Sequence, residues 1–264
     1  MNLTQVLILE ISPRCNLAHE HPECPTSSAE RWAGLDVSNC LDEITIYCIV
    51  RRAYEDLGFR GLVGFHYYNE PLLSRDILFP LMRRIRQRLP QARFMLWTNG
   101  TQLDKCSDEE LALFEQAYVS NYHRLNLARI ERLIPNTQVL DGSLDDRLTC
   151  DWDQYTTGPC YRPFLEWIVD YHGNCHLCCY DWRGRACVGN VFNNDLAVLV
   201  QRRQSIRDAM IGEMGDDTPR TCLGCSHRFG VMNAIDPSIA QEAAAYHQTQ
   251  LNLRRHFQDA STSV

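Results

Sequence analysis

The sequence predicts an α/β protein built on a parallel sheet, followed by a smaller region of mixed α and β structure. Short apolar runs of strand length alternate with segments of helical periodicity through the first half of the chain. Repeated βα units of this kind place their strands in parallel. Near residue 145 the pattern changes, because cysteines become dense and runs at 164–170 and 174–180 flank Gly173 like a hairpin.

Five strands are expected in the first half, at 6–11, 61–68, 93–99, 117–120 and 137–140. The carboxyl ends of parallel strands meet at one edge of a sheet, where α/β barrels carry their reactive loops. The segments that follow the first three strands are therefore predicted to line a common rim.

Helices are expected between these strands. One has Leu41, Ile44, Cys48 and Ile49 on a single face, and another covers 77–89 with Pro80 inside it. Further helices are expected from Ser107, over 125–134, from Leu196 and from Ser238. The arginines that are expected to form a solvated helix face are Arg83, Arg84, Arg86 and Arg88.

Length and charge narrow the class of protein. The 264 residues can bury a sizeable core, and a net charge of -7 argues against a surface devoted to nucleic acid or anionic lipid. The chain shows no apolar run long enough for a membrane span and no amino-terminal leader pattern. We therefore expect a cytoplasmic protein.

Thirteen cysteines indicate metal or redox chemistry, because a reducing compartment discourages structural disulfides. Three of them, Cys40, Cys48 and Cys106, are expected to be buried free thiols on apolar faces. Four others form a plausible tetrahedral set: Cys160, Cys178, Cys222 and Cys225. Spacing alone allows zinc or an iron–sulfur cluster, and Cys175, Cys179 or Cys187 could replace Cys178.

The C-terminal region resembles a known domain. The run "CYRPFLEWIVDYHGNCHLCCYDWRGRACVGNV", followed by "CLGC", is similar to the SPASM/twitch-type auxiliary domain of radical S-adenosylmethionine enzymes. The residues that match the pattern are Cys160, Gly173, Cys178, Gly189, Asn190, Cys222 and Cys225. The resemblance implies a 4Fe–4S cluster on the four cysteines of this set and favours Cys178 over its neighbours.

The N-terminal half resembles the partial (β/α)6 TIM-like barrel of the same superfamily. In "FHYYNEPLL", Glu70 and Pro71 match a Gly-Gly-Glu-Pro motif in which Tyr68 and Asn69 replace the glycines. The segment "LWTNGTQL" resembles the third-strand motif. The resemblance implies S-adenosylmethionine binding by Asn69, Glu70, Pro71, Thr98 and Asn99. Together with the change of pattern near residue 145 and the S-x-x-Q at Ser238, it predicts a barrel over 1–147, a small α+β twitch domain over 148–235 and a C-terminal helix and tail over 236–264.

The loop after the first strand departs from the family. "ISPRCNL" matches at Cys15, but the family pattern C-x3-C-x2-C then meets His19 and Pro22, and Cys24 lies two residues late. One interpretation is a variant 4Fe–4S cluster on Cys15, Cys24 and a third ligand, His19, His21 or Cys40. Another is a different metal such as zinc, and a third is a site that has been lost.

The resemblance implies a radical-type iron–sulfur oxidoreductase that removes a hydrogen atom from a small, carbohydrate-like substrate, as an aminocyclitol dehydrogenase of the family does. A reductant such as flavodoxin or ferredoxin is the implied electron donor, and no catalytic residue is assigned. Two alternatives stay open: a metal-binding or partner protein that retains only the auxiliary cluster, and another S-adenosylmethionine-dependent lyase or transferase.

Overall fold

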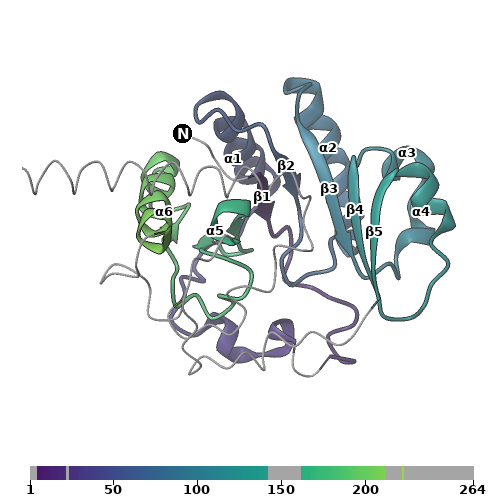
Figure 1. Ribbon diagram of the computed structural model, residues 1–264, viewed down its shortest axis with the longest axis horizontal. Coiled ribbons are helices and arrows are strands. Elements are labelled where there is room, and N and C mark those ends of the chain that lie inside the picture. The colour runs from purple at the N-terminus through teal and green to yellow at the C-terminus, as the bar shows by residue number, and fades with distance from the viewer. Residues whose placement is uncertain (1–4, 22–23, 142–161, 212–221, 223–264) are drawn as a thin grey trace, which may run out of the picture.

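The computed structural model describes residues 5–21, 24–141, 162–211 and 222. Its centre is an eight-stranded sheet with the order β5-β4-β3-β2-β1-β6-β7-β8 (Figure 1). The strands are β1 (Val6–Leu9), β2 (Leu62–Gly64), β3 (Arg93–Thr98), β4 (Gln116–Asn121), β5 (Asn136–Asp141), β6 (Glu166–Val169), β7 (Asn174–His176) and β8 (Gly189–Asn190).

The strands from β5 to β6 in this order are parallel, whereas β7 and β8 are antiparallel to their neighbours. The five strands expected in the first half are all present, with ends that differ by up to four residues. The α/β class and the open, partial-barrel arrangement are therefore confirmed.

The sixth parallel strand comes from the segment expected to belong to the C-terminal domain. β6 pairs with β1 from Val6↔Glu166 to Leu9↔Val169, and β7 then turns back against it. All four residues of β6 are buried, as the strands of a covered parallel sheet are. The hairpin thus extends the sheet of the N-terminal half, and the domain boundary near 147 falls outside the described residues and stays a prediction.

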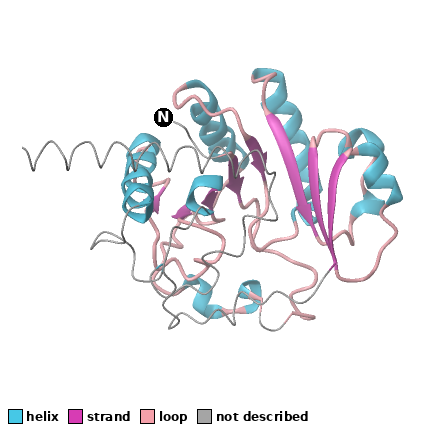
Figure 2. Cartoon of the chain, in the orientation of Figure 1, coloured by secondary structure: helices cyan, strands magenta, loops and turns pink. Residues whose placement is uncertain are grey.

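Helices lie between the successive parallel strands, and one more described helix follows β8 (Figure 2). They are α1 (Glu43–Glu55), α2 (Arg75–Arg88), α3 (Asp108–Leu111), α4 (Ala128–Leu133), α5 (Arg162–Leu165) and α6 (Leu196–Ile211). The helix start predicted at Ser107 is confirmed. The side chains of Ser107 and Glu110 form a capping box, in which each accepts a hydrogen bond from the other residue's backbone N–H. The helix expected from Ser238 lies outside the described residues.

The predicted face of α1 is wrong. Ile44 is 62% exposed, and the buried face consists of Ile46, Ile49, Val50, Ala53 and Tyr54. The helix begins at Glu43 because Asp42 accepts the backbone N–H of Thr45, which leaves Ile44 in the exposed first turn. The exposure of Cys48 follows from the same orientation, and Cys40 is exposed as well, so neither is the buried thiol expected of it.

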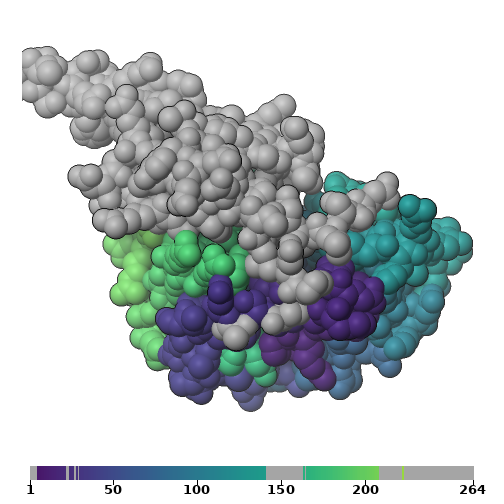
Figure 3. Space-filling view, turned by 90° about the horizontal axis from the view of Figure 1, so that it is seen from below, coloured from purple at the N-terminus to yellow at the C-terminus, as the bar shows by residue number. Residues whose placement is uncertain are grey.

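The segments that follow β1, β2 and β3 meet at one end of the sheet, the lower end in Figure 1. Seen from below, residues of the first forty form a band between the part of the chain around β3 to β5 and the part after residue 162 (Figure 3). Within the described residues, no helix has the length and apolar character that crossing a bilayer requires. The common rim expected from the sequence is therefore where the side chains for chemistry must be sought.

Candidate functional site

A cavity of about 840 Å³, counting the space at its mouth, opens at this end of the sheet. Residues from the three loops and from the C-terminal hairpin line it together. They are Ile8, Cys15, Leu17, His21, Cys24, His66, Tyr67, Tyr68, Asn69, Glu70, Trp97, Thr98, Asn99, Ser120, Tyr122, Glu166 and Cys179.

The loop after β1 directs two cysteines and one histidine to this cavity. The backbone N–H of His21 donates to Leu17 O at 3.1 Å, and that of Cys24 donates to His21 O at 2.9 Å. Leu17 is buried and anchors these turns. Cys15, His21 and Cys24 all line the cavity as a result.

Cys15 lies in an environment that disfavours a free thiolate. Burial raises its pKa, and the nearby Glu70 and Cys24 add to the effect. Asn99 Nδ2 approaches Cys15 Sγ at 3.9 Å and donates to Asn16 Oδ1 at 3.1 Å. This environment therefore favours the neutral thiol of Cys15.

The two histidines of the loop have different surroundings. The His19 side chain is 76% exposed and lies 3.6 Å from the Glu20 carboxylate, and His19 is not among the cavity residues. The His21 ring packs edge-on against Tyr122, with centroids 4.6 Å apart. Cys40 is also away from the cavity, with its sulfur 3.7 Å from His172 Nδ1.

Glu70 joins the loops that follow β2 and β3. Its carboxylate accepts the Thr98 hydroxyl at 2.8 and 2.9 Å, the Asn99 N–H at 2.7 Å and the Leu72 N–H at 3.0 Å. Burial raises the pKa of Glu70 to about 7 against the effect of these donors. The carboxylate thus holds Thr98 and Asn99 at the wall of the cavity.

The two remaining residues of the motif serve the local backbone. Asn69 lines the cavity, and its Oδ1 accepts the Tyr67 N–H at 2.9 Å while its Nδ2 donates to Phe65 O at 3.2 Å. Pro71 is buried at the start of the 3-10 helix Pro71–Ser74 and is not among the cavity residues.

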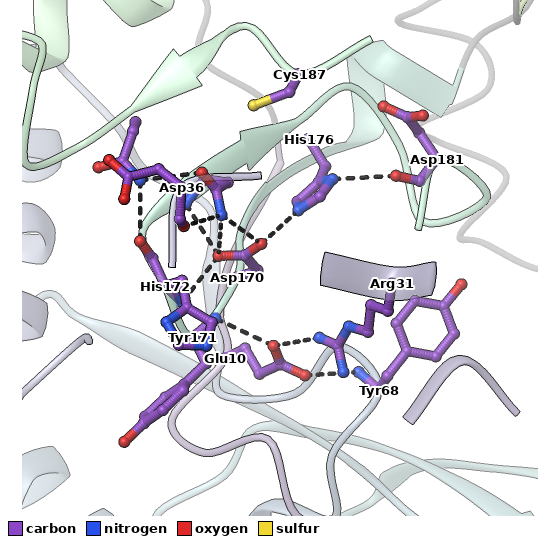
Figure 4. A network of polar contacts seen from close by, with 12 residues as sticks. Glu10, Arg31, Asp36, Tyr68, Asp170, Tyr171, His172, His176, Asp181 and Cys187 are labelled. Atoms are coloured by element: carbon purple, nitrogen blue, oxygen red, sulfur yellow. Dashed lines mark hydrogen bonds and ion pairs between the residues drawn. The ribbon is translucent and has the colours of Figure 1, made fainter. Parts of the chain in front are cut away.

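A buried ion pair beside the cavity was not anticipated from the sequence. Glu10 and Arg31 are ion-paired at 0% and 1% side-chain exposure, and Glu10 also accepts the N–H groups of Tyr68 at 3.1 Å and Tyr171 at 3.0 Å (Figure 4). The Arg31 guanidinium stacks over Trp32 at 4.3 Å. The sequence signal that could have identified Glu10 is its position, because it is a charged residue directly after an apolar strand of a parallel sheet.

A second buried pair lies in the hairpin. His176 Nε2 and Asp170 Oδ2 are 2.8 Å apart, and His176 Nδ1 lies 3.0 Å from Asp181 O (Figure 4). Burial opposes the charge on both partners, but their mutual hydrogen bond and attraction lower the pKa of Asp170 and raise that of His176. The Asp170–His176 ion pair therefore connects the two sides of the β6–β7 turn.

Of the predicted auxiliary-cluster ligands, Cys178 and Cys222 are described, whereas Cys160 and Cys225 lie outside the described residues. Cys222 packs against Leu177 and Ala186, so it lies next to the segment that carries Cys178. Of the alternatives to Cys178, Cys175 is fully buried on β7, Cys179 lines the cavity, and Cys187 Sγ donates to Gly189 O at 3.3 Å.

Cys106 is buried as predicted, and burial raises its pKa to about 11, which suits an unreactive thiol. In the part of the chain that the structure describes, no three histidine, cysteine or acidic side chains converge closely enough to hold a single metal ion. In the first loop, Cys15, His21 and Cys24 instead line a cavity.

The C-terminal part of the chain matches a known domain. Residues 160–226 match SPASM, an iron–sulfur cluster-binding domain. Over 99 residues the chain is 29% identical to the S-adenosyl-L-methionine-dependent 2-deoxy-scyllo-inosamine dehydrogenase of Niallia circulans. That match covers 37% of this chain and spans only 36% of the relative's length.

The fold is shared with solved structures of BtrN. The complex of BtrN with AdoMet and 2-DOIA has a TM-score of 0.58 at 20% identity, covering 85% of this chain and 94% of that chain. The open conformation of selenomethionine BtrN has a TM-score of 0.57 at 19% identity, covering 86% and 98%. The chain therefore shares the fold of BtrN and matches the SPASM iron–sulfur cluster-binding domain over residues 160–226.

Proposed function

We propose that the protein is an iron–sulfur oxidoreductase that binds S-adenosylmethionine and removes a hydrogen atom from a small hydroxylated substrate. The observation that carries the proposal is the shared cavity. Cys15, His21 and Cys24 of the first loop line it together with Asn69, Glu70, Thr98 and Asn99 of the next two. These are the loops in which the superfamily holds its first cluster and the cofactor.

The residues present fit a cluster in this cavity. Two sulfurs and one imidazole are donors that iron–sulfur clusters accept, and a cluster is larger than an ion, so its ligands surround a space. We assign His21 as the third ligand, in place of His19, because the His21 ring lines the cavity whereas His19 is turned towards solvent and Glu20. The auxiliary cluster is proposed on Cys160, Cys178, Cys222 and Cys225.

S-adenosylmethionine, held beside Asn69, Thr98 and Asn99, would supply the chemistry for abstracting a hydrogen atom from the substrate. The protein's own contribution is to position the cofactor and to exclude water. Thr98 and Asn99 are held at the wall by Glu70, and Trp97, stacked on Tyr118 at 4.8 Å, offers an aromatic surface in the same cavity. A reductant such as flavodoxin or ferredoxin would supply the electron.

The proposed substrate class rests on the relatives. The Niallia circulans relative is named for 2-deoxy-scyllo-inosamine, and BtrN was solved with 2-DOIA. The lining of the cavity includes polar side chains of the kind that hydrogen-bond such a ring, among them Glu166 and Asn99. We therefore propose a hydroxylated, carbohydrate-like substrate.

A second candidate is a partner protein that keeps the auxiliary cluster without cleaving S-adenosylmethionine. The observation in its favour is the first loop, which holds two cysteines where the superfamily has three.

Iron counting tests both candidates. We expect anaerobically reconstituted protein to hold about eight irons and a Cys15→Ala/Cys24→Ala variant about four. S-adenosylmethionine should change the EPR spectrum of the reduced wild-type protein only, and reduction should release 5′-deoxyadenosine. Equal iron content in both proteins, with no response to S-adenosylmethionine, would contradict the oxidoreductase and favour the partner protein.

A further inference from the structure

An exposed cysteine outside the cavity meets a histidine from a distant part of the chain. Cys40 lies in the connection that precedes α1, and its side chain is exposed. Its Sγ lies 3.7 Å from Nδ1 of His172, which comes 132 residues later in the β6–β7 turn. A thiol within hydrogen-bond reach of an imidazole is the arrangement that activates a cysteine as a nucleophile.

The surroundings of His172 fix which ring nitrogen carries the proton. Nδ1 lies 2.8 Å from the backbone oxygen of Asn39. Because a carbonyl oxygen only accepts, this contact assigns the proton to Nδ1, within reach of both Asn39 O and the Cys40 sulfur. The His172 backbone N–H donates to Asp170 Oδ1 at 2.9 Å, and the ring packs edge-on against Trp32 with centroids 4.7 Å apart. The imidazole is therefore held in place beside the thiol.

Two further groups act on this pair, and both lie by His172 (Figure 4). Hydrogen bonds with Ser38 lower the pKa of Asp36, and the nearby charge of His172 adds to the effect. Burial raises the pKa of Tyr171, and a hydrogen bond between its hydroxyl and Cys40 adds to that shift. The sulfur thus has two hydrogen-bond donors beside it, and donors to sulfur favour the thiolate, which is the reactive form of cysteine.

A second exposed cysteine provides a comparison within the same molecule. Cys48 lies on the exposed side of α1. Among the described residues, no other side chain forms a hydrogen bond or ion pair with the Cys48 thiol. Cys40 and Cys48 therefore share exposure and differ in the groups that surround the sulfur.

We propose that Cys40, activated by His172, is a site of reversible modification by small disulfides such as glutathione disulfide. The Cys40 thiolate attacks one sulfur of the reagent, so that a mixed disulfide forms and the reagent's own S–S bond breaks. The second half of the reagent leaves as a thiolate and takes up the proton that Cys40 lost. Cys40 is oxidised and the leaving half is reduced, and excess thiol reverses the reaction. The inference goes beyond the proposed function and requires neither iron nor S-adenosylmethionine.

The test is a timed exposure of the anaerobically reconstituted full chain to glutathione disulfide, followed by an acid quench and peptide mass mapping of each cysteine. We expect the mixed disulfide to form at Cys40 at least about tenfold faster than at Cys48. His172→Phe keeps an aromatic ring against Trp32 but removes the N–H. It should slow the reaction of Cys40 to the rate of Cys48 and leave Cys48 itself unchanged.

Equal rates at Cys40 and Cys48 in the wild-type protein would overturn the proposal. The same conclusion follows if His172→Phe leaves the rate at Cys40 unchanged or slows both cysteines equally. If His172→Phe does not fold, Tyr171→Phe, which removes one hydroxyl, takes its place. Slower reaction of Cys40 alone then supports the proposal, and an unchanged rate overturns it. Because no readout depends on iron, failure here leaves the proposed function standing.

Discussion

His19 and His21 are separated by one residue, yet the fold gives them opposite surroundings. The backbone turns that begin at Leu17 direct His21 to the cavity and against Tyr122, while His19 reaches solvent. Either imidazole could ligate iron, so residue type does not distinguish the two histidines. Side-chain exposure and orientation do.

We expect His21→Ala to lower the iron content of the reconstituted protein by about four irons, to the level of the Cys15→Ala/Cys24→Ala variant. His19→Ala, the matched control two residues away, should retain the wild-type iron content. Iron and sulfide analysis of both variants measures this. Loss of iron in His19→Ala alone would reverse the assignment.

The charged pair of Asp170 and His176 predicts a pH dependence of stability. The raised pKa of His176 stabilises the fold fully below its ordinary pKa of 6.5, and this contribution is lost as pH rises through the pKa in the folded protein. The lowered pKa of Asp170 stabilises the fold above pH 3.8. This contribution is lost as pH falls through the pKa that Asp170 has in the folded protein.

His176→Gln should therefore destabilise the protein by about 3 kcal/mol near pH 5 to 6, because Asp170 is left buried without its cation. The difference from wild type should shrink at alkaline pH. Urea unfolding of both proteins across this pH range measures the effect. A difference that grows as pH rises would contradict the charged state of the pair.

At the scale of elements, the β6–β7 hairpin attaches the C-terminal part of the chain to the main sheet, because β6 pairs with β1 and β7 pairs with β6. Its turn depends on Gly173, which has a φ of 81° and faces Phe192 and Val191. A Cβ at this position would lie 2.7 Å from Phe192 Cδ2 and 2.9 Å from Val191 Cγ2. Both the backbone conformation and the packing therefore exclude a side chain.

Gly34 offers a matched control for Gly173. It has a φ of 80°, and no heavy atom lies within 4 Å of the position of a Cβ. Gly34→Ala should cost only the left-handed backbone term, about 1 kcal/mol. Gly173→Ala should cost a further ~1–3 kcal/mol for overpacking. Denaturant unfolding measures both, and equal costs would mean that Phe192 moves aside freely.

At the scale of the whole molecule, the Glu10–Arg31 pair connects three distant segments. Glu10 follows β1, its oxygens accept N–H groups from Tyr68 and Tyr171, and Arg31 comes from the long connection before α1. Figure 4 shows these segments meeting at Glu10, and Tyr68 from one of them also lines the cavity. A buried carboxylate and guanidinium of this kind must both be present, since either alone is a buried, unpaired charge.

We expect Arg31→Met to lower the free energy of unfolding by about 3–5 kcal/mol. Glu10→Gln/Arg31→Met should cost clearly less than Arg31→Met, because no buried charge is left without a partner. A double-mutant cycle by chemical denaturation tests this. Additive costs would show that the two side chains do not interact energetically.

The sequence by itself determined the elements that depend on neighbouring residues. Short apolar runs of strand length located the five strands, and S-x-x-E located the start of α3, because both signals depend on residues that are close together in the sequence. The family resemblance also implied Asn69, Glu70, Thr98 and Asn99, and these residues line one cavity with Cys15 and Cys24.

Only the tertiary structure decided the rest. The pairing of β6 with β1, the meeting of Glu10 with Arg31 and the contact of Cys40 with His172 all join residues far apart in the chain. Local pattern carries no information on such partners, since strand pairing and charge compensation depend on how distant segments pack. The same holds for the exposed Ile44, whose place on α1 follows from which helix face meets the core.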